Sequence, residues 1–319
     1  MASGTLTESG AGAVVRRSSG VWSDAYGRLR KNKLAMFGLL LVIALFVLGL
    51  IGPIIAPFPY YAQDLEAIAA NNYRPLHPFE PISMQTGHWL GTDELGRDSL
   101  SRLLDGAQIS LAVAMVVQIV VLVIGVPIGA MAGWFGGRID NILMRFTDVM
   151  YAFPDLLLII LMSVTFRNTW LGQQFNGLLL VFIAIGLTSW VTVARLVRGQ
   201  LLSLKEIEFV EAARAIGVRD RRIVTKHLLP NSIGPVIVAI TLGIPGAILA
   251  EATLAFLGVG VQPPRASWGS LINEGVRYIR SDPHLVLLPA IAIATSMMSF
   301  TFLGDGLRDA LDPKLKGKQ

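Results

Sequence analysis

Long apolar segments alternate with polar segments along most of the chain. Six of them are nearly free of charge, and a helix rising about 1.5 Å per residue would carry each across roughly 30 Å of hydrocarbon. They are residues 34–55, 109–132, 150–166, 177–194, 232–256 and 285–303, and the third can begin as early as Ile139. The pattern predicts an all-α integral membrane protein with six transmembrane helices.

Composition supports a membrane protein. Charged residues make up 15% of the 319 residues, against about 25% in soluble proteins, and mean hydropathy is +0.59. The first apolar segment is not a cleavable signal peptide, because Pro53 and Pro57 stand where small residues would be needed. The chain has no cysteine, which excludes disulfides, thiolate metal sites and a cysteine nucleophile.

The distribution of basic residues predicts the orientation. With six spans both termini share a side, and that side carries 20 of the 27 Lys and Arg residues. The positive-inside rule then places both termini in the cytoplasm. The net charge of +5 follows this loop pattern, so the lipid bilayer is the expected partner of the basic residues and no nucleic acid is expected.

The segments predict four regions. Residues 1–33 form a cytoplasmic arm whose Ser-, Gly- and Ala-rich start is typical of disorder. Residues 34–105 hold the first span and a long extracytoplasmic loop, 106–310 form the main membrane domain, and 311–319 are a cytoplasmic tail. Gly125, Gly129, Gly133 and Gly137 are four apart, which favours close helix packing, either within the chain or with another subunit.

One hydrophilic stretch lies between two apolar spans, on the predicted cytoplasmic side. Seven of the twenty residues in 211–230 carry charge. Ser203 and Glu206 fit a capping box for a helix over 204–216. Gly217 suits the position after that helix, and Asp220 can cap a second helix that starts one residue later. Such a loop either anchors two spans or fits a groove in another protein.

Sequence motifs make the second interpretation specific. Glu211-Ala212-Ala213, Gly217 and Leu229-Pro230 resemble the EAA loop of ABC importer permeases. Four more stretches resemble the C-type subunit of dipeptide and oligopeptide permeases, and the likeness covers roughly 28–316. These stretches are LGTD-x-LGRD at 90–98, ARLVRGQ at 194–200, FLGVGVQPP at 256–264 and LGDGLRD at 303–309.

The resemblance implies a type I ABC importer permease fold in the cell (inner or plasma) membrane. It implies four partner subunits of three kinds: a second homologous permease subunit, two ATPase subunits and an extracytoplasmic solute-binding protein. It also implies that loop 203–230 is the coupling element that docks on an ATPase, through Glu211, Ala212, Ala213, Gly217 and Asp220. The cargo would be dipeptides or oligopeptides, although relatives in this branch carry nickel, glutathione and other solutes.

The chain is not expected to be an enzyme or to hold a cofactor. It lacks the G-x-x-x-x-G-K-[ST] phosphate loop, so ATP and magnesium would be bound by the ATPase subunits. An intramembrane enzyme is disfavoured because no histidine lies clearly within a span. An ion-coupled transporter acting alone remains the alternative, although no inverted repeat is visible.

Two acidic residues lie in predicted spans. Glu251 would cost about 3 kcal/mol facing lipid, so it should face the bundle interior or water. Asp155, next to Pro154, is a weaker case of the same kind. Each is a candidate for the translocation pathway, and a hydrated position near the outer surface is an equally good interpretation of Glu251.

Several external residues are candidates for contact with a substrate-delivery protein. They are Asp93, Arg97, Asp98 and Trp268, the last opening an apolar stretch with helical spacing that could also lie on the membrane. Asp98 could instead begin a helix. The acids lack the 12-residue frame of a calcium loop, so no metal site is expected. His77 and His88 are expected to be solvated loop residues.

Overall fold

The computed structural model describes residues 21–312, and all regular elements in that range are helices. The parts of the predicted arm and tail at 1–20 and 313–319 lie outside the described residues. The helices are α1 (Val21–Lys31), α2 (Lys33–Ile55), α3 (Leu65–Ala70), α4 (Pro81–Thr86), α5 (Ser99–Phe135), α6 (Gly137–Ala152), α7 (Asp155–Phe166), α8 (Trp170–Gln173), α9 (Leu178–Leu204), α10 (Glu208–Ala215), α11 (Asp220–Ile223), α12 (Leu229–Phe256), α13 (Trp268–Val276) and α14 (His284–Leu311).

Five of the six predicted spans are single long helices: α2, α5, α9, α12 and α14. The sixth differs from the expectation of one straight span. It is the pair α6 and α7, bent by 82° at a short break. The break falls at Phe153 and Pro154, because proline lacks an amide hydrogen and disfavours helix in the residue before it. The described chain therefore has five or six spans.

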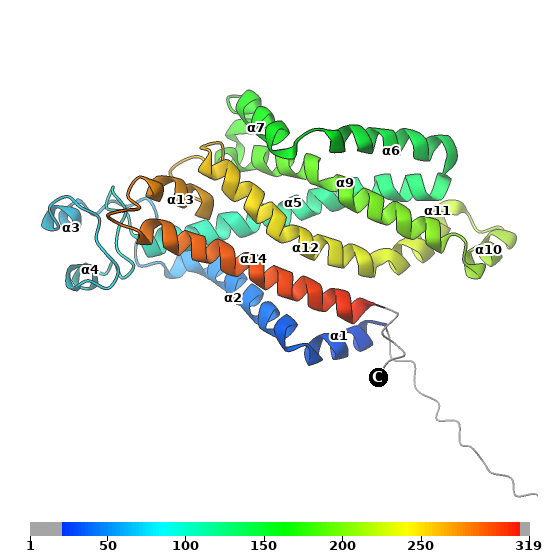
Figure 1. Ribbon diagram of the computed structural model, residues 1–319, viewed down its shortest axis with the longest axis horizontal. Coiled ribbons are helices and arrows are strands. Elements are labelled where there is room, and N and C mark those ends of the chain that lie inside the picture. Colours follow the sequence, from blue (N-terminus) through cyan, green and yellow to red (C-terminus); the bar gives the residue numbers. More distant parts are fainter. Residues whose placement is uncertain (1–20, 313–319) are drawn as a thin grey trace, which may run out of the picture.

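The long helices lie side by side, and the short elements gather at the two ends (Figure 1). α3 and α4 are at one end, and α10 and α11 are at the other. The described chain starts and stops at the α10 end, where Arg28 of α1 donates a hydrogen bond to the Asp312 carbonyl at 3.1 Å. Both ends of the described chain thus lie at the same end of the bundle.

The stripe of glycines on α5 packs against α9 of the same chain. A Cβ on Gly125 would come within 2.9 Å of the Trp190 carbonyl oxygen, and one on Gly133 within 2.9 Å of the Arg198 carbonyl oxygen. Gly129 contacts α9 between them. These contacts favour the intrachain interpretation of the stripe, because small residues let two membrane helices approach closely. A Cβ on Gly137 would meet no atom of another segment within 4 Å, and this glycine starts α6.

No break in the structure marks the expected boundary between residues 34–105 and 106–310. The expected boundary falls inside α5, which runs without interruption from Ser99 to Phe135. At Gly106 the helix lies directly against Trp268 of α13. The start of α5 is therefore packed against α13 at this end.

Candidate functional site

A cavity of about 650 Å³ opens among α5, α7, α9 and α12 at the level of the spans. Its volume is in the usual range for pockets that hold small molecules. Most of its lining is apolar, and the polar contributions come from Gln118, Tyr151, Asp155, Thr188, Ser189, Thr192 and Thr253. A wall with scattered polar groups can hold a polar solute weakly enough to release it.

Asp155 lines this cavity and has an exposed side chain. It is the first residue of α7, directly after the bend, where a carboxylate complements the positive end of the helix dipole. The structure thus places the only acid of the cavity lining at the break between α6 and α7. A part in the translocation pathway stays a prediction for this residue.

Glu251 lies elsewhere. Its side chain is 1% exposed and accepts a hydrogen bond from the Ser110 hydroxyl at 3.0 Å, while its second carboxylate oxygen has no partner. The same hydroxyl accepts the backbone N–H of Trp268 at 3.3 Å. Glu251 therefore faces the bundle interior, as predicted, but between α12, α5 and α13 rather than in the cavity wall.

Four charged side chains form a largely buried network at the start of α5. Arg102 donates hydrogen bonds to Asp93 and to Glu274, both at 2.6 Å, and Arg97 donates to the same two acids at 2.6 and 2.8 Å. Burial on its own would raise the pKa of Glu274, but the hydrogen bonds from Arg102 and Arg97 hold it below its usual value. The network fastens the external loop to α13.

Asp98 begins α5, which was one of the two interpretations of its sequence. Its carboxylate accepts the backbone N–H and the hydroxyl of Ser101, both at 2.7 Å, as an N-cap residue does. The other carboxylate oxygen lies 3.0 Å from Nδ1 of His88.

The external candidates for contact with a delivery protein are largely buried, and their part in such a contact stays a prediction. Asp93, Asp98 and Trp268 are buried, and Arg97 is nearly so. The indole N–H of Trp268 donates to the Leu103 carbonyl at 3.1 Å, so this residue packs into the bundle instead of lying on the membrane. Any contact with a delivery protein in this conformation has to involve neighbouring exposed residues.

His88 is also not the solvated loop residue that was expected. It is fully buried between Asp98 and Asp64, with Nε2 3.3 Å from the Asp64 carboxylate, and it stacks on Phe58. Burial on its own would lower the pKa of His88, but hydrogen bonding to the two carboxylates raises it. Asp64 comes from 24 residues away, so sequence spacing gave no signal for this contact.

At the opposite end, the helix α10 is shorter than predicted. Ser203 does not cap it: α9 continues to Leu204, and the Ser203 hydroxyl bonds back to the Gly199 carbonyl at 3.2 Å. Asp220 does not cap the second helix either. It is the first residue of α11, after Arg219, and makes no capping hydrogen bond.

Gly217 occupies the position predicted for it. Its φ is +78°, and the N–H groups of Gly217 and Val218 bond to the carbonyls of Arg214 and Ala213 at 2.9 and 3.0 Å. This is the Schellman pattern that ends a helix on a left-handed glycine. The chain can therefore turn sharply back toward α12.

One side of α10 is held by the bundle and the other is free. Val210 is fully buried, and the Arg214 guanidinium lies 4.5 Å from the centre of the Trp134 ring. Glu211 and Ala212 are exposed, and Ile216 just beyond the helix is 80% exposed. An isoleucine this exposed, next to an acid and small side chains, offers a contact surface to another protein.

Residues 125–317 match the family of binding-protein-dependent transport system inner membrane components. The chain belongs to this family. Residues 20–75 match the N-terminal transmembrane domain of oligopeptide transport permease C, which places the chain in the C-type branch of peptide permeases.

Curated relatives cover nearly the whole chain. It is 44% identical over 307 residues to the dipeptide transport system permease protein DppC of Bacillus subtilis (strain 168), covering 96% of this chain and 90% of the relative. It is 38% identical over 303 residues to the oligopeptide transport system permease protein OppC of the same organism, covering 95% and 93%.

A solved structure shares the fold. An inward-facing MetNI methionine ABC transporter matches with a TM-score of 0.53 and 20% identity, covering 66% of this chain and 96% of that one. At this identity the match shows the fold alone, which is the predicted type I permease arrangement.

Proposed function

We propose that this chain is a permease subunit of an ATP-driven peptide importer, that it lines the translocation pathway together with a second permease, and that α10 is its coupling contact with an ATPase subunit. The observation that carries the proposal is the exposed surface of α10 and Ile216, at the end where both ends of the described chain lie. The names of the relatives support dipeptides or oligopeptides as the cargo.

The orientation is part of the proposal. The basic residues gather at the α10 end, so the positive-inside rule places that end in the cytoplasm of a cell whose inner membrane holds the chain. A cysteine introduced at Ser203 should then be labelled only from the cytoplasm, and one at Asn71 only from outside. Labelling of both from the same side would overturn this orientation.

The coupling contact is tested with the whole assembly, using two variants of the projecting surface. Glu211→Lys reverses a charge that would be partly desolvated in an interface. Gly217→Val puts a branched side chain on a left-handed backbone, at a cost of roughly 1 kcal/mol or more. Neither variant should impair insertion, because no atom lies within 4 Å of a Cβ at Gly217 and Glu211 is exposed.

Both variants should lower the amount of ATPase that co-purifies, or leave ATP hydrolysis running without peptide uptake. Glu66→Lys is the matched control, because Glu66 is an exposed acid on α3 at the opposite end. Normal ATPase retention and uptake in both variants would show that the loop only anchors two spans. Uptake by the purified chain alone would favour the ion-coupled alternative.

A further inference from the structure

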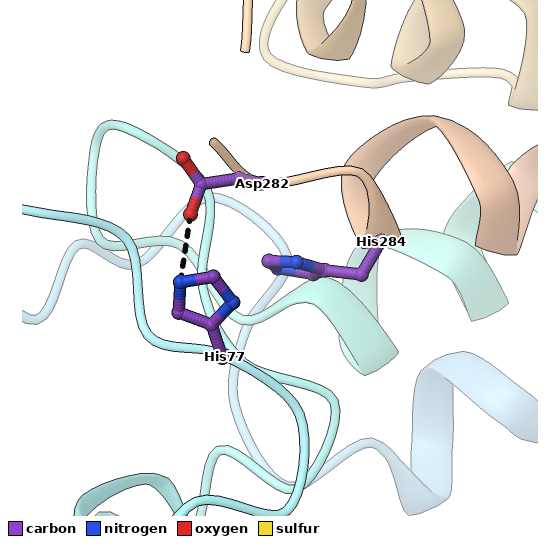
Figure 2. A group of neighbouring side chains, drawn as sticks. All are labelled: His77, Asp282 and His284. Carbon is purple, nitrogen blue, oxygen red and sulfur yellow. Dashed lines mark ion pairs between the residues drawn. The ribbon is translucent and has the colours of Figure 1, made fainter. Parts of the chain in front are cut away.

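Three potential metal ligands meet at the end of the bundle that carries α3 and α4. His77 lies in the loop between α3 and α4, while Asp282 and His284 lie where the chain enters α14. Figure 2 shows the three side chains turned toward one another. One ligand atom from each lies within 4.8 Å of the others, and Nε2 of His77 is 3.3 Å from Oδ1 of Asp282.

His284 carries the strongest signal. The residue is 8% exposed, and neither ring nitrogen makes a hydrogen bond of normal geometry, although the Thr92 backbone lies near the ring. Buried polar groups are nearly always paired, because leaving one unpaired costs about 1–3 kcal/mol. A plain ion pair between His77 and Asp282 explains their contact but leaves His284 without a role. A cation bound by all three side chains explains both.

The spacing and the charge suit a metal ion. Zinc bonds to nitrogen and oxygen at about 2.0–2.1 Å, which puts tetrahedral ligand atoms about 3.4 Å apart. The His77–Asp282 distance of 3.3 Å is close to this value, and the His284 nitrogen, within 4.8 Å of both atoms, would have to move closer when an ion binds. The negative charge of Glu80 also acts on this ring.

The site has a route for an ion to enter. The side chain of His77 is 41% exposed, whereas Asp282 is buried behind it. An ion could therefore reach the ligands from the aqueous side through His77. Two imidazoles and one carboxylate suit borderline first-row divalent ions better than calcium or magnesium, which prefer oxygen ligands.

We propose that His77, Asp282 and His284 bind a divalent transition-metal ion, with zinc(II) as the ion they suit best and water as the remaining ligand. The ion would join residues more than 200 positions apart and clamp the external loop to the start of α14. This site is independent of the coupling contact and of the cavity, so its test does not depend on the transport activity.

The test is zinc binding by the full chain, purified without a polyhistidine tag and stripped with a chelator. Competition with a chromophoric chelator should give one zinc ion per wild-type chain. Asp282→Asn and His284→Gln should each weaken binding by more than about tenfold, since losing even an outer-shell partner costs about 10- to 100-fold. His227→Gln is the control, because His227 is exposed and lies near α10. With four histidines and no cysteine in the chain, background binding should be low.

A wild-type chain that binds no zinc, or variants that bind it as tightly as wild type, would overturn the site. Two readouts protect the test against misfolded variants. Wild type loaded with cobalt(II) should show the intense visible absorption of four-coordinate cobalt, and weak six-coordinate bands would contradict the proposal. Zinc should also raise the melting midpoint of wild type but not that of Asp282→Asn.

Discussion

Replacing Gly129 by alanine should loosen one of the tightest helix contacts in the bundle. A Cβ at this position would lie closer to the Ala194 carbonyl oxygen than real contacts allow, and 2.9 Å from the Cβ of Val197. Neither neighbour can move away alone, because one is backbone and the other is fixed at the root of its side chain. α5 and α9 therefore have to separate locally by a sizeable fraction of an ångström.

The free-energy cost of Gly129→Ala can be compared with that of a matched glycine-to-alanine substitution on α9. Overpacking by a single carbon costs about 1–3 kcal/mol in well-packed interiors. Gly199→Ala is the control on α9, since a Cβ there meets nothing within 4 Å and gains up to about 1 kcal/mol of helix propensity. The two variants should thus differ by roughly 2–4 kcal/mol, in favour of Gly199→Ala.

The assay is the apparent melting midpoint of each purified variant at one fixed scan rate, because membrane proteins often unfold irreversibly. At roughly 2–4 °C per kcal/mol, Gly129→Ala should melt several degrees below Gly199→Ala. Equal midpoints, or a higher one for Gly129→Ala, would refute the argument that the glycine stripe is needed for close approach.

Three further predictions concern charged groups. His88→Gln should flatten the loss of stability at alkaline pH, because the raised pKa of His88 gives wild type a contribution that is complete below about pH 6.5 and lost as pH rises through the folded-state pKa. Glu274→Gln should flatten the acid side in melting experiments, since the lowered pKa of Glu274 gives a contribution present above about pH 4.5 and lost as pH falls through the folded-state pKa. Asp155→Asn should lower uptake of cationic peptides relative to neutral ones in proteoliposomes, more than Glu251→Gln does, because Asp155 lines the cavity and Glu251 does not.

Local features were predictable from the sequence. The spans follow from hydropathy, the left-handed turn from Gly217, and the start of α5 from Asp98. The capping box at Ser203 was wrong although its letters fit. An N-cap residue has to lie outside any preceding helix. Ser203 instead lies within α9, and its hydroxyl donates to the backbone carbonyl four residues earlier.

Contacts between distant segments were not predictable. Arg102 contacts Glu274, which is 172 positions away in the sequence, and His77 contacts Asp282, which is more than 200 positions away. A single sequence shows each residue only as a charge in a loop, and several partners were equally available. The burial of Asp93 and Trp268 could not be predicted for the same reason, because it depends on how α13 folds back against α5.

The α3 and α4 end of the molecule is held together by buried ion pairs and the cavity wall is not, and this difference limits where the cavity can change shape. At the α3 and α4 end, the buried network of Arg102 and Glu274 and the pairing of His88 join the external loop, α5 and α13, and breaking a buried ion pair costs about 3–5 kcal/mol. The cavity wall lacks such pairs, and one of its sides is the break before Asp155. If α10 is displaced, as the proposed coupling contact requires, the α6–α7 bend should offer less resistance than the fastened loop, so we expect the bent span to move rather than the loop to separate.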